Sequence, residues 1–167
     1  MLMMATTSND QAGRCVSRKQ AAEALGYTFN PGNWNSGHVS LDDCVVLFVT
    51  GDGDYADECK QGPRPNGEFR WSSQNSTTPT GKKGRELIDG TKPVYVFWRK
   101  TKRMFNIVRR FEFLGVYTYA RHQGSAPMHV TFMPSNQSSP TVDPCAHRDT
   151  GRGVCVDCGA ILESGDA

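Results

Sequence analysis

Residues 67–99 constrain the fold most, because they hold two strand signals, a polar loop and a helix signal within a short span. An aromatic strand, residues 68–71, leads into a loop of small polar side chains, residues 72–80. A short basic helix, residues 81–89, then leads into an apolar strand, residues 94–98. The segment therefore predicts two strands joined by a loop and one helix.

Outside this segment the sequence predicts one more helix and three more strands, at residues 17–26, 44–49, 111–119 and 126–133. Ser17 is a candidate N-cap, and Gly26 ends the helix. Gly115 interrupts the alternation of the strand at residues 111–119 and predicts a bulge or bend, with four core candidates around it: Phe111, Phe113, Val116 and Tyr117. This order of elements favours an α+β fold. We expect a curved, mostly antiparallel sheet or a partly closed β-barrel with flanking helices.

The length of 167 residues suits one main domain with a small appendage. We expect a flexible tail at residues 1–16, the domain at residues 17–134, a Ser/Pro/Asn-rich linker at residues 135–143 and a Cys/His tail at residues 144–167. No apolar run is long enough to span a bilayer, and the N-terminus lacks the apolar core of a signal peptide. The expectation is a cytoplasmic protein that does not contact membranes.

The polar loop at residues 72–80 lies between Trp71 and a group of cations, Lys82, Lys83 and Arg85. Its hydroxyl and amide groups suit a planar polar ligand, while the cations suit phosphate groups. An ordinary turn, whose Ser, Asn and Thr side chains satisfy the local backbone, has the same composition. The loop alone leaves both interpretations open.

Positive charge is concentrated in one segment, although the formal net charge of the chain is only +2. Residues 99–110 hold six cations and no acid: Arg99, Lys100, Lys102, Arg103, Arg109 and Arg110. A local basic patch on a nearly neutral protein is compatible with binding to a nucleic-acid backbone. A solvated hairpin has a similar composition.

The C-terminal tail carries four residues with metal-ligand spacing: Cys145, His147, Cys155 and Cys158. The C-x-H and C-x-x-C-G patterns predict a Cys₃His zinc site with a knuckle turn at Gly159. A redox C-x-x-C pair or a flexible tail is the alternative. Of the other cysteines, Cys44 is expected in the core, whereas Cys15 and Cys59 have no informative spacing.

No catalytic motif is recognisable in the sequence. His38, His122 and His129 lack metal-ligand spacing, and the chain has no P-loop, G-x-S-x-G, H-E-x-x-H, paired-carboxylate nuclease or deaminase pattern. A binding module is therefore favoured over an enzyme.

Several motifs in order resemble one known family. They are the F-R-W-S-S-Q-N-S-T-T-P run from Phe69, K-K-G-R at Lys82, V-Y-V-F-W-R from Val94, F-E-F-L-G-V-Y-T-Y from Phe111 and G-S-A-P-M-H-V from Gly124. This series resembles the C-terminal domain of unknown function found on restriction helicases that carry a phospholipase-D-like nuclease. Its layout is also similar to SRA/YDG readers and the PUA-like fold, in which a curved sheet cups a flipped base.

The resemblance implies recognition of modified cytosine, such as 5-methylcytosine, in double-stranded DNA during restriction, by flipping the base into an aromatic cup. For such a mechanism, the candidate cup residues by side-chain chemistry are Asp54, Tyr55, Trp71, Ser73, Gln74, Asn75 and Trp98. The candidate phosphate-binding residues are Lys82, Lys83, Arg85, Arg99, Lys102, Arg103, Arg109 and Arg110. An ordinary core position is the alternative for Trp71 or Trp98, because alternation turns only one strand face toward a cup.

The chain departs from the family pattern in three ways. It has Trp98 where phenylalanine or valine usually precedes the arginine, it carries the Cys/His tail, and it has no helicase or nuclease attached. The expectation is a free-standing reader with a separate nuclease or helicase as partner. Two other functions stay open: an RNA-binding PUA-like module, and a protein-interaction adaptor stabilised by zinc. Salt dependence and a preference for DNA over RNA would separate these possibilities.

Overall fold

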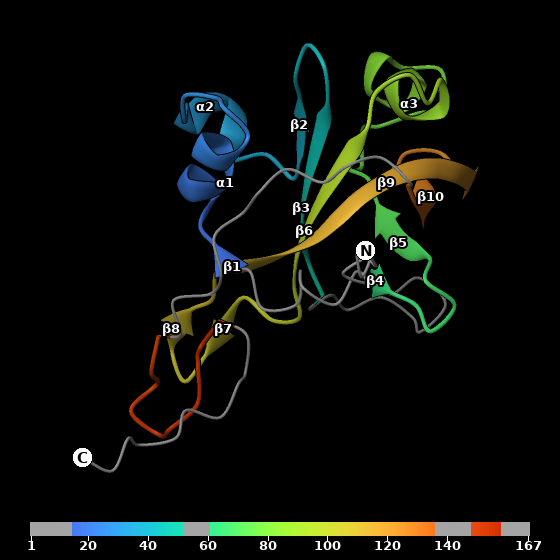
Figure 1. Cartoon of the computed structure of the whole chain (residues 1–167). Helices are drawn as coiled ribbons and strands as arrows, with labels where there is room; N and C mark the ends of the chain where they lie inside the picture. Colours follow the sequence, from blue (N-terminus) through green and yellow to red (C-terminus); the bar gives the residue numbers. More distant parts are fainter. Residues whose placement is uncertain (1–14, 52–60, 136–147, 158–167) are drawn as a thin grey trace, which may run out of the picture.

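A strongly curved sheet forms the body of the protein in the computed structural model, which describes residues 15–51, 61–135 and 148–157 (Figure 1). The strands run in the order β2-β3-β6-β9-β10-β5-β4, and β1 pairs with β9 beside this path. Strands β3 and β6 are parallel, and the other described neighbours are antiparallel. The expected α+β class with a mostly antiparallel sheet is confirmed.

The described strands are β1 (Cys15–Val16), β2 (His38–Ser40), β3 (Val45–Thr50), β4 (Gly62–Pro63), β5 (Phe69–Ser72), β6 (Val94–Arg99), β7 (Arg103–Met104), β8 (Ile107–Val108), β9 (Phe111–Gln123) and β10 (His129–Pro134). The described helices are α1 (Arg18–Ala24), α2 (Pro31–Trp34) and α3 (Lys82–Ile88). Strands β7 and β8 form a separate small hairpin. None of the helices in the described ranges is long and apolar enough to cross a membrane.

Helix α1 begins where the sequence predicted, because Ser17 and Gln20 form a capping box. The Ser17 hydroxyl accepts from the Gln20 amide at 3.2 Å, and the Gln20 side chain accepts from the Ser17 amide at 2.9 Å. Helix α2 and strand β2 lie within residues 27–40, where the abundance of Asn, Gly and Ser in the sequence predicts a loop. That expectation was wrong because the buried side chains of Trp34 and Val39 fix these short elements through packing rather than local propensity.

Helices α1 and α2 cover the convex face of the sheet, where they complete one hydrophobic core (Figure 1). The rings of Phe48, Phe97 and Phe113 form its centre, with centroids 5.2 Å apart between Phe48 and Phe97 and 5.0 Å between Phe97 and Phe113. Ala21 and Ala22 of α1 are fully buried against this layer. The expected core role of Cys44 is also confirmed, since Cys44 is buried here.

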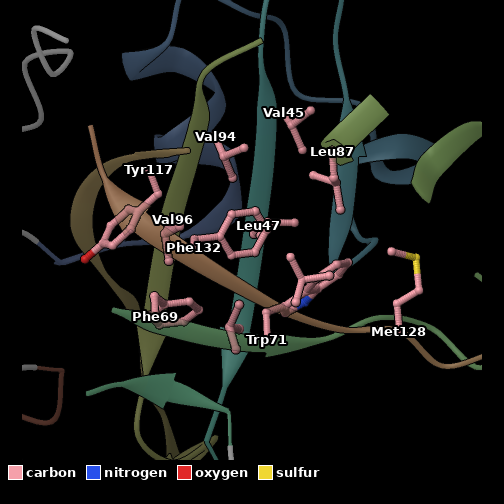
Figure 2. Packing of buried hydrophobic residues seen from close by; sticks show 12 residues of the cluster. Val45, Leu47, Phe69, Trp71, Leu87, Val94, Val96, Tyr117, Met128 and Phe132 are labelled. Carbon is pink, nitrogen blue, oxygen red and sulfur yellow. The ribbon is translucent and has the colours of Figure 1, made fainter. Parts of the chain in front are cut away.

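The concave face encloses a second hydrophobic core, which we call the concave core (Figure 2). Alternation along β3 sends Val45, Leu47 and Val49 into it, while the intervening residues face the helices. Side chains from β5, β6, β9 and β10 meet these residues from the other side of the curve, as do Leu87 of α3 and Met128. The inside of the curved sheet is therefore packed with apolar side chains.

The sheet does not close into a barrel, because β2 and β5 are not hydrogen-bonded to each other in the described structure. Their side chains nevertheless meet: the rings of His38 and Trp71 lie 5.7 Å apart, and Gln74 Nε2 donates to Ser36 Oγ at 3.4 Å. We call this junction the seam. The partly closed barrel is thus corrected to an open sheet in which the edge strand β2 and the strand β5, next to the other edge, meet through side chains.

Strand β9 carries the predicted irregularity at Gly115, where the register with β6 shifts and the glycine has a φ of 127°. The strand continues to Gln123, beyond its expected end at residue 119, because β10 pairs with it along this extension. A second register shift occurs between Thr131 and Phe132 of β10, so Ala120 of β9 has no residue of β10 in register with it. Strand β9 therefore pairs with β1 and β6 in its first half and with β10 in its second half.

Candidate nucleic-acid interface

An open groove of about 530 Å³ lies between α1, the end of β6, the start of β9 and the segment at residues 148–157. We call it the basic groove, because six cations line it together with two aromatic rings: Arg18, Lys19, Arg99, Arg109, Arg110, Arg148, Phe29 and Phe111. Its described lining contains no aspartate or glutamate. Three of the predicted phosphate-binding residues, Arg99, Arg109 and Arg110, come together here.

Arg99 is held rigidly at the centre of the groove. Its Nε donates to Thr50 Oγ1 at 2.9 Å, its Nη1 donates to the carbonyl of Arg109 at 2.9 Å, and its guanidinium lies 4.1 Å from the ring centre of Phe111. Stacking on an aromatic face and donation to fixed oxygens both orient a guanidinium group. Arg99 therefore presents a preorganised cation.

Arg18 reaches the same ring from α1. Its Nη1 donates to the carbonyls of Trp34 and Ser36 at 3.1 and 2.9 Å, and its guanidinium lies 4.6 Å from the ring centre of Phe48 and 5.2 Å from that of Phe111. The sequence predicts that the 17–26 helix packs against the sheet and that its basic first turn could contact phosphate. Arg18 itself was not among the predicted phosphate-binding residues.

The cations of the groove repel one another. Burial, and then the neighbouring Arg99, lower the pKa of Arg18 to about 10. Burial, and then Arg109, also lower the pKa of Arg99. Both side chains remain charged at neutral pH, and a bound anion would relieve their repulsion. The Nε of Arg109 is buried without a hydrogen-bond partner in the described part of the chain, so a phosphate oxygen would satisfy it.

Asp157 attaches the C-terminal segment to this region. Its carboxylate accepts from Arg148 Nε at 2.7 Å and from the Arg110 amide at 2.5 Å, and it is buried. Burial by itself would raise the pKa of Asp157, but the hydrogen bonds from Arg148 and Arg110 outweigh it and the pKa is lowered. Arg109 donates to the Asp157 carbonyl at 2.8 Å. The segment thus supports two arginines of the groove.

The other predicted phosphate-binding residues lie elsewhere. Lys102 and Arg103 are exposed on the β7–β8 hairpin. Lys82, Lys83 and Arg85 belong to α3, at the opposite end of the sheet from that hairpin (Figure 1). The fold therefore divides the predicted cations among three surfaces, and Lys82 and Arg85 share theirs with the acids Glu86 and Asp89.

The two tryptophans expected in a base-binding cup lie in or against the concave core. Trp71 is 5% exposed and packs between His38 and Phe132. Trp98 packs edge-on against Phe69 at 5.8 Å, and a methyl group at Gly62 would lie 2.7 Å from its Cη2 atom. Trp71 is therefore buried, whereas Trp98 keeps partial exposure while packing against Phe69.

The polar residues predicted for the cup divide into two kinds. Ser73 is buried, where its hydroxyl accepts from the Met128 amide at 2.8 Å and donates to the Gln74 carbonyl at 3.0 Å. Gln74 and Asn75 are exposed at the rim of the seam. Asp54 and Tyr55 lie outside the described residues. The structure adds His38, which faces Trp71 at the seam, is 2% exposed and has no hydrogen-bond partner on either ring nitrogen among the described residues.

The predicted zinc ligands lie largely outside the described residues. Cys155 is described and fully buried, in a turn that pairs it with Asp149 and contains two glycines of positive φ. Cys145, His147 and Cys158 fall outside the described ranges, within which no three metal-ligating side chains gather. The buried thiol suits zinc, and the site stays a prediction that metal analysis of the purified protein would test.

The comparisons with known proteins show a loose structural likeness and no match by sequence. No protein-family model matches the chain, and no curated protein matches it. The solved structure of the MspJI restriction endonuclease in complex with a 27-mer oligonucleotide is similar over 59% of this chain and 31% of that chain. The sequence identity is 13% and the TM-score is 0.40.

Proposed function

We propose that this protein binds double-stranded DNA and recognises a modified cytosine in it, as a binding module and not as an enzyme. The observation that carries DNA binding is the basic groove, in which burial together with the nearby Arg99 lowers the pKa of Arg18, and burial together with the nearby Arg109 lowers the pKa of Arg99. A groove of fixed, mutually repelling arginines is suited to successive phosphate groups. Phe111 and the carbonyls that hold these side chains reduce the entropy lost on binding.

Recognition of the modified base is proposed at the seam, on the strength of the motif resemblance at residues 69–85. Gln74 and Asn75 are exposed there and present amide donors and acceptors to a base edge. His38 supports this placement, because a polar ligand would pair its buried nitrogen atoms. Entry of a base would require the Gln74–Ser36 hydrogen bond, which is 3.4 Å long, to open.

The energies permit such a mechanism. Flipping a base out of the duplex costs a few kcal/mol. Stacking on an aromatic side chain, which Trp71 could provide only after the seam has opened, returns about 1–3 kcal/mol for each base. A small apolar contact to a methyl group would then discriminate modified from unmodified cytosine by roughly tenfold to a hundredfold.

The test is a fluorescence-anisotropy titration with matched duplexes that contain cytosine, 5-methylcytosine or 5-hydroxymethylcytosine. We expect Arg99→Gln to weaken binding to all three equally and to reduce the salt dependence by about one phosphate contact. We expect Gln74→Ala and Asn75→Ala to reduce only the preference for the modified duplex. These two exposed positions are better probes than Trp71, whose truncation would disturb the core.

Lys92→Gln provides a matched loss of one positive charge away from the groove, because Lys92 pairs with Glu86 and donates to the Leu41 carbonyl. It should leave both affinity and preference unchanged. Equal affinity for the three duplexes would refute base recognition while retaining DNA binding. Tighter binding to duplex RNA would favour the RNA-binding alternative, and salt-insensitive or absent binding would favour the protein adaptor.

A further inference from the structure

A polar surface lies at the far end of β9, remote from the basic groove, where β5, β10 and β9 run side by side. Because the sheet register is fixed there, their side chains form two rows across the three strands. Arg70, Thr131 and Arg121 make one row, and Ser72, His129 and Gln123 make the other. Alternation sends Trp71 and Val130 into the concave core, so the two rows occupy the opposite face of the sheet.

These two rows line a cavity of about 270 Å³, which we call the row pocket. Its described lining holds two arginines and two histidines and no carboxylate. Thr131 lies between the two arginines in the register and is buried, so it forms the floor. The pocket is large enough for a phosphate group with part of an attached sugar.

His129 is positioned by Ser72, whose hydroxyl lies 2.8 Å from His129 Nδ1. When Ser72 donates this hydrogen bond, Nε2 carries the ring proton and can donate to a ligand. Arg121 is positioned by Glu68, to which its two terminal nitrogens donate at 3.1 and 2.9 Å. Glu68 thus fixes the Arg121 guanidinium beside the pocket, and Arg70 lies close enough to interact electrostatically with the same carboxylate.

From this arrangement we infer that the row pocket binds a phosphate group through Arg70, Arg121 and His129. Two guanidinium groups and an imidazole on a rigid sheet provide the charged, directional donors that phosphate oxygens require. If the phosphate belongs to a DNA backbone, the inference rests on the proposed function. If it belongs to a small phosphate ester or to inorganic phosphate, the inference stands independently.

The distance between the two sites sets the DNA length for the test. Strand β9 runs from Phe111 in the basic groove to Gln123 in the row pocket. Twelve residue steps of about 3.3 Å separate the sites by at most about 40 Å along the strand. A duplex of about 24 base pairs is therefore long enough to contact both.

The first arm of the experiment records amide and imidazole NMR spectra of the full chain during titration with inorganic phosphate and with a nucleoside 5′-monophosphate. We expect concentration-dependent shifts at Ser72, His129 and Thr131 that disappear in Arg70→Gln. Glu68→Gln serves as a second variant, since it keeps both arginines and should retain or strengthen the shifts. An absence of shifts at these residues with either probe, combined with no effect of Arg70→Gln on DNA binding, overturns the inference.

The second arm measures binding of the 24-base-pair duplex by Arg70→Gln, with Lys92→Gln as the control. A DNA-backbone contact predicts a roughly three- to tenfold loss of affinity and a salt slope smaller by about one. Phosphate-induced shifts with unchanged DNA affinity would assign the pocket to a small phosphate ligand. If the wild-type protein binds no DNA, the proposed function fails. The phosphate titration then still decides whether the row pocket binds a phosphate group.

Discussion

The concave core and the basic groove use the same kinds of side chain in opposite ways. In the concave core, aromatic rings such as Trp71 and Phe69 are buried among aliphatic side chains and stabilise the curvature of the sheet. In the groove, the Phe111 ring instead serves as a platform for Arg99 and Arg18. An aromatic residue in a binding motif is therefore not by itself a ligand contact, and its role depends on what the sheet places over its face.

Truncation of Trp71 would test this contrast with the largest effect. We expect Trp71→Ala to lower the free energy of unfolding by about 3–5 kcal/mol, because it leaves a cavity among Phe132, His38 and their neighbours. Urea denaturation monitored by circular dichroism measures this change. Val108→Ala is the control, since Val108 is largely exposed and should change stability by less than about 0.5 kcal/mol. A small effect at Trp71 would mean that its ring is available to a ligand.

The second largest effect is expected from acidification, which should lower the free energy of unfolding through His38 at the seam. Burial, and then the nearby Lys83, lower the pKa of His38 to about 4, below its ordinary value of 6.5. The unfolded chain binds the extra proton first, so stability is complete above pH 6.5 and is lost as the pH falls towards 4. The loss amounts to roughly 3 kcal/mol over this range.

Urea denaturation at pH 7.5, 6.0 and 4.5 would measure that loss, with His38→Leu as the comparison. The variant should lack this component of the pH dependence and, at pH 7.5, should be at least as stable as the natural protein, because an unpaired buried polar group has been removed. His122 and His129 are present in both proteins, so the difference isolates His38. Parallel pH profiles for the two proteins would contradict the burial of an unpartnered imidazole.

A smaller, local effect is expected for the segment that supports the groove. Asp157→Asn removes the negative charge that holds Arg148 and Arg110. We expect about 1–3 kcal/mol of lost protection in the segment, seen as faster hydrogen exchange at the Val156 and Thr150 amides, which donate within the segment. Exchange at β3 amides should stay unchanged. Equal acceleration throughout the sheet would show that the segment is part of the global folding unit.

Local signals in the sequence predicted a substantial part of this fold. The N-cap at Ser17, the continuous apolar run of β3, the irregularity at Gly115 and the core positions Phe111 and Phe113 depend mainly on neighbouring residues. Strand β2 and helix α2 escaped prediction because they are short and are fixed by contacts to distant residues. The polar loop also contains features of the simpler interpretation, since Ser73 is occupied by backbone hydrogen bonds.

The sequence by itself determined the fold class, most of the helix and strand positions and the presence of abundant cations near residue 100. Only the tertiary structure decided which cations act together. Arg18, Arg99 and Arg148 are far apart in the chain, and they meet because β9 pairs with both β1 and β6 and because Asp157 docks on the start of that strand. The same register turned Trp71 inward and Arg70 outward, since adjacent residues of a strand face opposite sides of the sheet.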